Sequence, residues 1–370
     1  MKLANPFVIR GYAGAEYFCD RVKESTRLVS ALRNERDVTL IAPRRYGKTG
    51  LIRNVFERLG KETPTVYLDV YSTRNLADFT KLLAGAVVGA LDTKVEKAMS
   101  NAAKFFRSCR PTVTPQEFGF PKFSFDIAPL MAEATLKESF DYIAKRDRRL
   151  VIAIDEFQQI LEYPETGTEA LLRGFIQFVP QVQFIFAGSR QHLMREMFMQ
   201  PQHPFYQSTE IMNLDVIGER EYAEFARNFF NGAGYPFEDD VFARLYRRFD
   251  GITWYLQIVL NRLWEYGKGV ADDETVESAI AELVETRDFE YHDLLVSQSE
   301  TGSRLLRGIA AEGPVEAPQS ADFLAKCGGL AASSAASALD TLLSRDLVYR
   351  TERGYVVYDR FFGIWLKGLA

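Results

Sequence analysis

The first half of the chain alternates between short apolar runs and helical patterns. Continuous apolar runs, rather than alternating ones, are typical of strands buried on both faces of a parallel sheet. Five such runs are expected strands, at residues 37–42, 65–70, 150–154, 183–187 and 210–214. Helical patterns follow the first strand and separate the later ones, at residues 48–59, 75–92, 131–147 and 168–178. This alternation predicts an α/β core built on a parallel sheet.

Residues 111–129 interrupt the alternation with four prolines and with aromatic residues at every second position. The segment predicts a hairpin inserted between helices. Its aromatic side chains would share one face of a strand, because strand side chains alternate. That face is either exposed for a partner or packed on the core, and the residues concerned are Phe118, Phe120, Phe123 and Phe125.

The pattern changes after Gly218, where the apolar strands stop. Helices are expected at residues 218–231, 238–249, 253–266 and 273–289. After Gln298, three further helices are expected at 300–312, near 320–326 and at 332–344. Two short strands, 347–351 and 355–358, then flank a turn at Arg353-Gly354. Three helices followed by a two-stranded wing predict a winged helix-turn-helix.

Composition agrees with a multidomain globular protein. A chain of 370 residues with 47% hydrophobic and 26% charged residues exceeds one ordinary core. No apolar run approaches the roughly 18–20 residues of a membrane span, and the N-terminus lacks a signal-peptide pattern. Three widely spaced cysteines fit no metal pattern and indicate a reducing, cytoplasmic setting. The net charge of −5 gives no global attraction to nucleic acid or to a membrane.

The loop after the first strand fits the pattern G-x-x-x-x-G-K-[ST], except that Ala42 stands at the first glycine. Such a loop turns backbone N–H groups toward an anion beside a helix N-terminus. Lys48 would reach the β- and γ-phosphates, and the Thr49 hydroxyl would bind Mg²⁺. We therefore predict that a nucleotide is bound with Mg²⁺ by Pro43, Arg44, Arg45, Tyr46, Gly47, Lys48, Thr49 and Gly50.

A second part of this site follows the strand at 150–154, which ends in Asp155 and Glu156. An aspartate at the tip of a buried strand can reach Mg²⁺, often through water. The next glutamate is placed to orient or deprotonate the attacking water. We predict Asp155 as a metal ligand and Glu156 as a catalytic residue. Alternatively, the two carboxylates only cap a helix that begins at Phe157.

The strand at 183–187 is followed by Gly188, Ser189 and Arg190. In P-loop enzymes the strand beside the metal carboxylate often ends in a polar group that contacts the γ-phosphate or its water. Ser189 is therefore a candidate nucleotide contact and Arg190 a candidate catalytic residue. The alternative is an ordinary turn with a solvated arginine.

Several segments together are distinctive: Asn5-Pro6-Phe7, Phe18-Cys19-Asp20-Arg21, the phosphate loop, VIAIDEFQ (151–158), FAGSR (186–190) and the ending at 358–366. In this order they resemble the archaeal-type ATPases, of the STAND group of signal-transduction NTPases within the AAA+-like class. The resemblance covers nearly the whole chain. It implies a P-loop ATPase core at 1–215 with the hairpin near 111–129, a helical lid at 216–296 and a winged helix-turn-helix at 297–370.

The resemblance also implies functional residues. Asn5, Phe7 and Arg21 would lie against the adenine, and the lid would contact the nucleotide through a Gly-x-Pro segment. The chain departs from the family here, because Thr253 stands where proline is usual after Gly251. ATP with Mg²⁺ is the implied ligand, and ADP the product.

The charge of the expected winged helix bears on its partner. Residues 297–370 contain eight Lys or Arg and eight Asp or Glu. The expected recognition helix offers only Ala and Ser at 332–338, whereas DNA affinity and base reading rely on cations and on Arg, Asn or Gln. A packing or regulatory role is favoured, although Arg350 and Arg353 keep DNA as an alternative partner.

We therefore predict an Mg-dependent ATPase with slow hydrolysis, which acts as a molecular switch on an unidentified protein partner. The alternative is a nucleotide-loaded, DNA-binding regulator with little turnover. Glu156 favours the ATPase, because binding alone requires no catalytic carboxylate.

Overall fold

The computed structural model describes residues 3–369, apart from 93–94, 115–121, 147, 239 and 268. The chain divides into two compact units: Arg10–Tyr222 form one, and Met1–Ile9 with Ala223–Ala370 form the other. We call them the nucleotide unit and the helical unit. Among the described residues, no helix is both long and apolar enough to cross a membrane.

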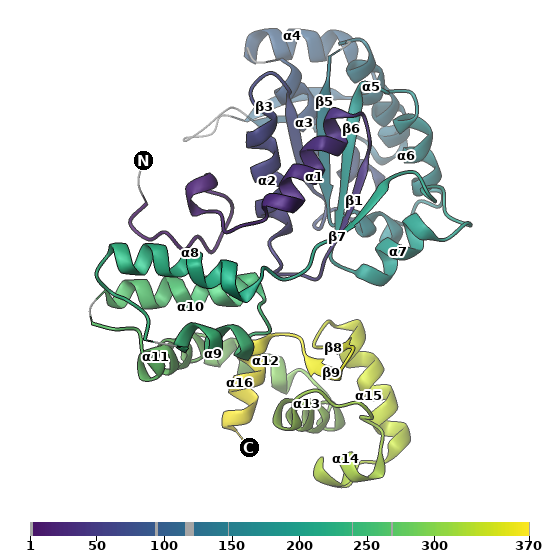
Figure 1. Ribbon diagram of the computed structural model, residues 1–370. Coiled ribbons are helices and arrows are strands. Elements are labelled where there is room, and N and C mark those ends of the chain that lie inside the picture. The colour runs from purple at the N-terminus through teal and green to yellow at the C-terminus, as the bar shows by residue number, and fades with distance from the viewer. Residues whose placement is uncertain are drawn as a thin grey trace. The chain divides into compact units, whose positions relative to one another are not determined.

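A five-stranded sheet in the order β2-β5-β6-β1-β7 forms the centre of the nucleotide unit (Figure 1). Its strand pairs are all parallel. The strands are β1 (Val38–Ile41), β2 (Thr65–Asp69), β5 (Leu150–Asp155), β6 (Val182–Gly188) and β7 (Glu210–Asn213). The predicted α/β class with a parallel sheet is confirmed, and each expected strand is present.

Helices cover both faces of the sheet, as Figure 1 shows. They are α1 (Val22–Arg33), α2 (Lys48–Leu59), α3 (Leu76–Leu91), α4 (Val95–Phe105), α5 (Ala132–Ala144), α6 (Thr168–Ile176) and α7 (Gln191–Met199), with 3₁₀ turns at Ala15–Tyr17, Pro129–Met131 and Phe157–Glu162 (η3). On β5, Ile152 and Ile154 belong to one apolar cluster, and Val151 and Ala153 to the other. The central strands β1, β5 and β6 are buried at every position and are mostly apolar, because they separate two cores.

A hairpin of β3 (Arg110–Thr114) and β4 (Lys122–Asp126) lies in this unit, and its strands pair antiparallel. Phe123 and Phe125 are buried in the core on the α3 side of the sheet. A Cβ added at Gly85 of α3 would lie 2.5 Å from the Phe123 carbonyl oxygen, so this glycine permits the close approach of β4. Of the two roles considered for the aromatic face, these two side chains take the core role. Phe118 and Phe120 lie outside the described residues.

The helical unit contains most of α8 (Glu219–Gly232), then α9 (Val241–Arg248), α10 (Thr253–Tyr266), α11 (Asp273–Glu285) and α12 (Asp288–Val296). The helix expected over 273–289 is therefore two helices. The Thr286 hydroxyl donates to the Leu283 carbonyl, and Arg287 leaves helical geometry at φ −114°. Side-chain bonding to the backbone of this kind competes with helix continuation.

The winged helix follows in the same unit, as α13 (Glu300–Glu312), α14 (Ala321–Lys326), α15 (Ala332–Ser344), β8 (Val348–Thr351) and β9 (Gly354–Val357). A final helix, α16 (Arg360–Gly368), was not expected from the sequence. The Asp359 carboxylate caps it by accepting from the N–H groups of Phe361 and Phe362. Its buried face holds Phe361, Phe362 and Leu366 in the unit.

Asp37 gives the nucleotide unit a pH-dependent stability. Its carboxylate precedes β1 and accepts from the Phe184 N–H at 2.8 Å. Burial raises the pKa of Asp37 to about 6, against the lowering effect of that hydrogen bond and of Arg173. Between pH about 4 and 6 the folded chain therefore binds more protons than the unfolded chain, so the free energy of unfolding falls as pH rises.

We expect Asp37→Asn to remove this dependence and to stabilise the chain above pH 6, by up to about 3 kcal/mol. The amide oxygen can still accept from Phe184. Urea unfolding at several pH values between 4.5 and 7.5 measures the effect, with Glu62→Gln at an exposed site as the control. An unchanged pH slope in the Asp37 variant would show that another group titrates.

Candidate phosphate-binding site

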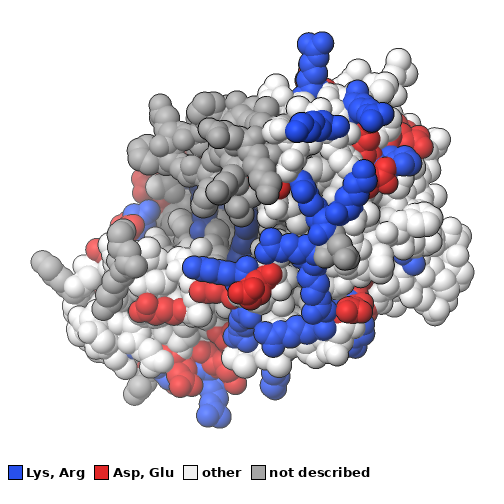
Figure 2. Space-filling view, turned by 90° about the horizontal axis from the view of Figure 1, so that it is seen from above, with Lys and Arg blue, Asp and Glu red and all other residues white. Residues whose placement is uncertain are grey.

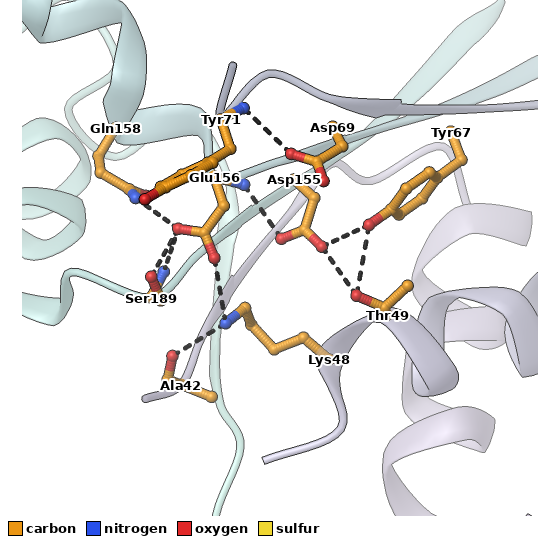
Figure 3. A network of polar contacts seen from close by, with 10 residues as sticks. All are labelled: Ala42, Lys48, Thr49, Tyr67, Asp69, Tyr71, Asp155, Glu156, Gln158 and Ser189. Carbon is orange, nitrogen blue, oxygen red and sulfur yellow. Dashed lines mark hydrogen bonds and ion pairs between the residues drawn. The ribbon is translucent and has the colours of Figure 1, made fainter. Parts of the chain in front are cut away.

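The phosphate loop connects β1 to α2, and its backbone is turned by two residues with positive φ. Arg45 has φ 73° and Gly47 has φ 88°. Left-handed geometry is unusual for arginine and marks a constrained loop. Lys48, only 6% exposed, donates from Nζ to the Ala42 carbonyl at 3.2 Å and so bridges the loop (Figure 3). With α2 beginning at Lys48, the loop and the helix N-terminus together have the geometry of an anion site.

Two oxygen side chains meet beside Lys48. The Thr49 hydroxyl donates to Asp155 Oδ2 at 3.1 Å, from the first turn of α2 to the tip of β5. Mg²⁺ prefers oxygen ligands, and it usually keeps several waters and binds through one or two protein groups plus phosphates. Among the described residues, no group of three or more His, Cys, Asp or Glu could form an all-protein metal cage. Thr49 and Asp155 thus fit an Mg²⁺ ion that is shared with a nucleotide.

The Glu156 carboxylate points into the same site (Figure 3). Its Oε1 lies 3.8 Å from Lys48 Nζ. Its Oε2 accepts from Gln158 Nε2 at 2.6 Å and from the Ser189 hydroxyl at 2.5 Å. Glu156 precedes η3 with φ 56°, and its side chain makes no capping hydrogen bond to this turn. The geometry therefore favours a role in the site over the capping alternative.

Charge keeps this carboxylate ionised. Burial raises the pKa of Glu156, but the Lys48 ammonium and the hydrogen bonds from Ser189 and Gln158 outweigh burial and leave it below the ordinary value. An ionised carboxylate that is fixed by donors can orient a water molecule and accept its proton.

The side chains of Ser189 and Arg190 have different partners. Ser189 donates to Glu156 from both its hydroxyl and its backbone N–H. Arg190 instead forms an ion pair with Glu162 of η3. A role in catalysis for Arg190 stays a prediction, and it would require the guanidinium to exchange Glu162 for a phosphate.

Arg21 supports the phosphate loop from outside. Its side chain is 3% exposed, and Nη2 donates to the Tyr46 carbonyl at 3.2 Å while Nη1 binds Glu24 at 2.8 Å. The structure therefore brings Arg21 to the loop backbone. It holds the Tyr46 peptide in place, which the sequence pattern did not indicate.

Asn5 and Phe7 lie in the helical unit. Asn5 donates to the Asn261 carbonyl at 2.9 Å, and Phe7 is fully buried. The Phe7 ring packs against Phe229, Phe230 and Trp264, at centroid distances of 5.8, 5.1 and 5.9 Å. The adenine contact expected for Asn5, Phe7 and Arg21 stays a prediction.

Tyr67, which the sequence pattern did not indicate, lies beside the predicted Mg²⁺ ligands Thr49 and Asp155. The Tyr67 hydroxyl donates to Asp155 Oδ2 at 2.6 Å and lies 3.3 Å from the Thr49 hydroxyl (Figure 3). Burial raises the pKa of Tyr67, so the hydroxyl keeps its proton. The sequence carries no signal for this contact, which arises because β2 pairs with β5.

We expect Arg21→Met to weaken ATP binding by roughly tenfold without abolishing it. The variant loses the charged donor that holds the Tyr46 carbonyl, and a hydrogen bond to a charged group contributes about 1.5–3 kcal/mol. Calorimetric titration with Mg·ATP measures the loss. The exposed arginine Arg58 of α2 provides the control, Arg58→Met, which should bind normally. Wild-type affinity in Arg21→Met would mean that the loop holds its shape without this contact.

Two family models match the chain. One, described as an ATPase domain predominantly from Archaea, matches residues 18–259. The other, described as a probable winged helix domain, matches residues 289–368. Among curated proteins, none matches the sequence.

Solved structures share the fold over almost the full length. A Walker-type ATPase of Pyrococcus abyssi superposes with a TM-score of 0.66 at 18% identity, covering 98% of this chain and 99% of that one. The ORC2 protein of Aeropyrum pernix, in ADPNP and ADP complexes, gives 0.54 at 18% identity over 95% and 93%. The ORC1 protein of Aeropyrum pernix, in complex with DNA, gives 0.53 at 14% identity over 99% and 97%.

The first family model spans the phosphate loop, the Asp155–Glu156 strand end and Ser189, and it covers well over half of the chain. The chain therefore belongs to the family of P-loop ATPase domains found predominantly in Archaea, and it carries a winged helix behind the ATPase domain.

Proposed function

We propose that the chain binds ATP with Mg²⁺ in the nucleotide unit and hydrolyses it slowly, as a STAND-type molecular switch that acts on a protein partner. The observation that carries this proposal is the placement of Glu156. Its carboxylate is ionised, fixed by Ser189 and Gln158, and 3.8 Å from the lysine of the phosphate loop. A site that only held nucleotide would need no such group.

In this proposal each residue of the site has its own role. Lys48, which bridges the loop, would bind the β- and γ-phosphates together with the loop amides, and Thr49 and Asp155, which are hydrogen-bonded to each other, would hold Mg²⁺. When bound, Mg²⁺ supplies positive charge to the phosphate oxygens. Glu156 orients the attacking water and accepts its proton, and Ser189 and Gln158 keep the carboxylate in position. Arg190, which pairs with Glu162, would have to leave that carboxylate to contact the γ-phosphate.

The DNA-binding alternative has less support, because several exposed arginine side chains are already paired within the protein. In the wing, Arg353 is bound to Asp250 at 2.8 Å, and Arg350 lies over the Tyr355 ring. In the nucleotide unit, the exposed Arg36 pairs with Glu210 at 2.8 Å. Figure 2 shows a band of Lys and Arg across one face, with Asp and Glu side chains beside it. Cations that are already paired with carboxylates contribute little to phosphate binding.

Turnover measurements separate the two functions. We expect phosphate release from ATP that requires Mg²⁺, stops with EDTA and does not change when duplex DNA is added. Tight DNA binding with negligible turnover would support the regulator instead. A chain that neither binds nor hydrolyses ATP would contradict both.

A further inference from the structure

A cavity of about 460 Å³ lies within the helical unit, where the wing and α16 meet the segment after α9. Its lining residues all fall between Arg248 and Lys367, so none belongs to the phosphate-binding site. The volume is within the range of about 300–1,000 Å³ that small-molecule sites occupy.

The charge of the lining is strongly positive. It contains four cations and a single carboxylate: Arg248, Arg353, Arg360, Lys367 and Asp250. Arg353 and Arg360 both donate to Asp250, each at 2.8 Å, and Arg248 pairs with Glu277 outside the lining. Even with both carboxylates counted, four positive charges face two negative ones, and the excess matches a dianion.

Two of these cations have donors that no described protein group uses. Arg360 binds Asp250, Tyr349 and the Val357 carbonyl through its terminal nitrogens, but its buried Nε has no hydrogen-bond partner. Lys367, on the exposed end of α16, has no carboxylate within 4.0 Å in the described part of the chain. A buried donor without a partner is costly and calls for an explanation. An anion bound in the cavity would supply one if the Arg360 side chain turned its Nε, which has almost no exposed surface here, toward the ligand.

The rest of the wall is apolar. Ile309, Pro314, Val356 and Ile364 line the cavity beside the cations. Small-molecule sites typically combine such apolar walls with a few charged groups that fix the orientation of the ligand. A phosphate monoester carries two negative charges and three acceptor oxygens, which matches this excess of cations better than a carboxylate does. Its organic part would lie on the apolar wall.

We infer that this cavity is a second binding site, which takes a small organic phosphate with an apolar body. The phosphate contacts Arg360, Arg353 and Lys367, and the site is independent of the ATP site.

Calorimetric titration with phenyl phosphate tests the site. The full chain carries Lys48→Ala in all samples, to suppress phosphate binding in the phosphate loop. We expect saturable binding that Arg353→Ala and Lys367→Ala each weaken by about tenfold, because each loses a charge-assisted contact. Both side chains are exposed, so neither substitution disturbs the core. Inorganic phosphate should bind more weakly than phenyl phosphate, because it lacks the apolar body.

Arg307→Ala is the matched control, since this exposed arginine of α13 lies outside the lining. It should bind phenyl phosphate with unchanged affinity. Absence of saturable binding, or equal losses in all three variants, would overturn the inference. So would a duplex oligonucleotide that bound through Arg353 and Lys367 while phenyl phosphate did not, because DNA would then be the occupant.

Discussion

The Lys48→Ala variant is expected to lose ATP affinity by two to three orders of magnitude, or about 3–4 kcal/mol. Lys48 is the nearly buried ammonium at the phosphate loop, and it lies between the Ala42 carbonyl and Glu156. Water and dissolved cations could compensate for the lost charge of an exposed lysine. They cannot do so for a lysine that is nearly buried. Calorimetric titration of the variant with Mg·ATP measures the loss.

Lys61→Ala is the matched control, because it removes the same charge from an exposed position just after α2. It should bind ATP normally. Thermal unfolding of both variants is needed alongside, since Lys48→Ala also leaves the Glu156 carboxylate without its ammonium partner. Wild-type affinity in a folded Lys48→Ala protein would place the nucleotide elsewhere.

The sheet could be predicted from the sequence because its central strands β1, β5 and β6 are buried on both faces. Val151 and Ala153 meet one core and Ile152 and Ile154 the other, so β5 is apolar from Leu150 to Ile154. Such an apolar run can be recognised in the amino-acid sequence alone. The phosphate loop was equally visible, because its chemistry depends on residues that are adjacent in sequence.

Features set by distant contacts could not be predicted in the same way. The ion pair between Arg190 and Glu162, 28 residues earlier on η3, could not be predicted, and the catalytic role of Arg190 stays a prediction. In the sequence, Tyr67 is an ordinary strand residue. Only the pairing of β2 with β5 in the fold brings its hydroxyl to Asp155. Arg21 likewise reaches Tyr46 only through the packing of α1 against α2.

The final helix, α16, could not be predicted from the sequence either, because its formation also depends on distant contacts. Residues 358–366 are recognisable in the sequence as a family ending but not as a helix, although Asp359 is a favourable N-cap residue. The cap and the buried face with Phe361 and Leu366 become evident together only when the rest of the helical unit is present. Short helices of this kind depend on tertiary packing more than on propensity.

Glu156→Gln is expected to reduce ATP turnover by about a hundredfold or more while leaving ATP affinity nearly unchanged. The amide keeps the shape of the side chain, and its oxygen can still accept from Ser189, but it cannot take a proton from water. Lys48 and the hydrogen bonds from Ser189 and Gln158 hold the pKa of Glu156 below the ordinary value of a glutamate. The wild-type rate should therefore decline through loss of this base only at a pH lower than an ordinary glutamate would require.

Asp155→Asn provides the contrast, because it should raise the Mg²⁺ concentration required for turnover, whereas Glu156→Gln should not. Single-turnover phosphate release at a series of Mg²⁺ concentrations distinguishes the two effects. Normal turnover in both variants would exclude the end of β5 as the catalytic edge. A loss of affinity in Glu156→Gln equal to its loss of turnover would make this carboxylate a structural partner of Lys48 rather than the base that activates water.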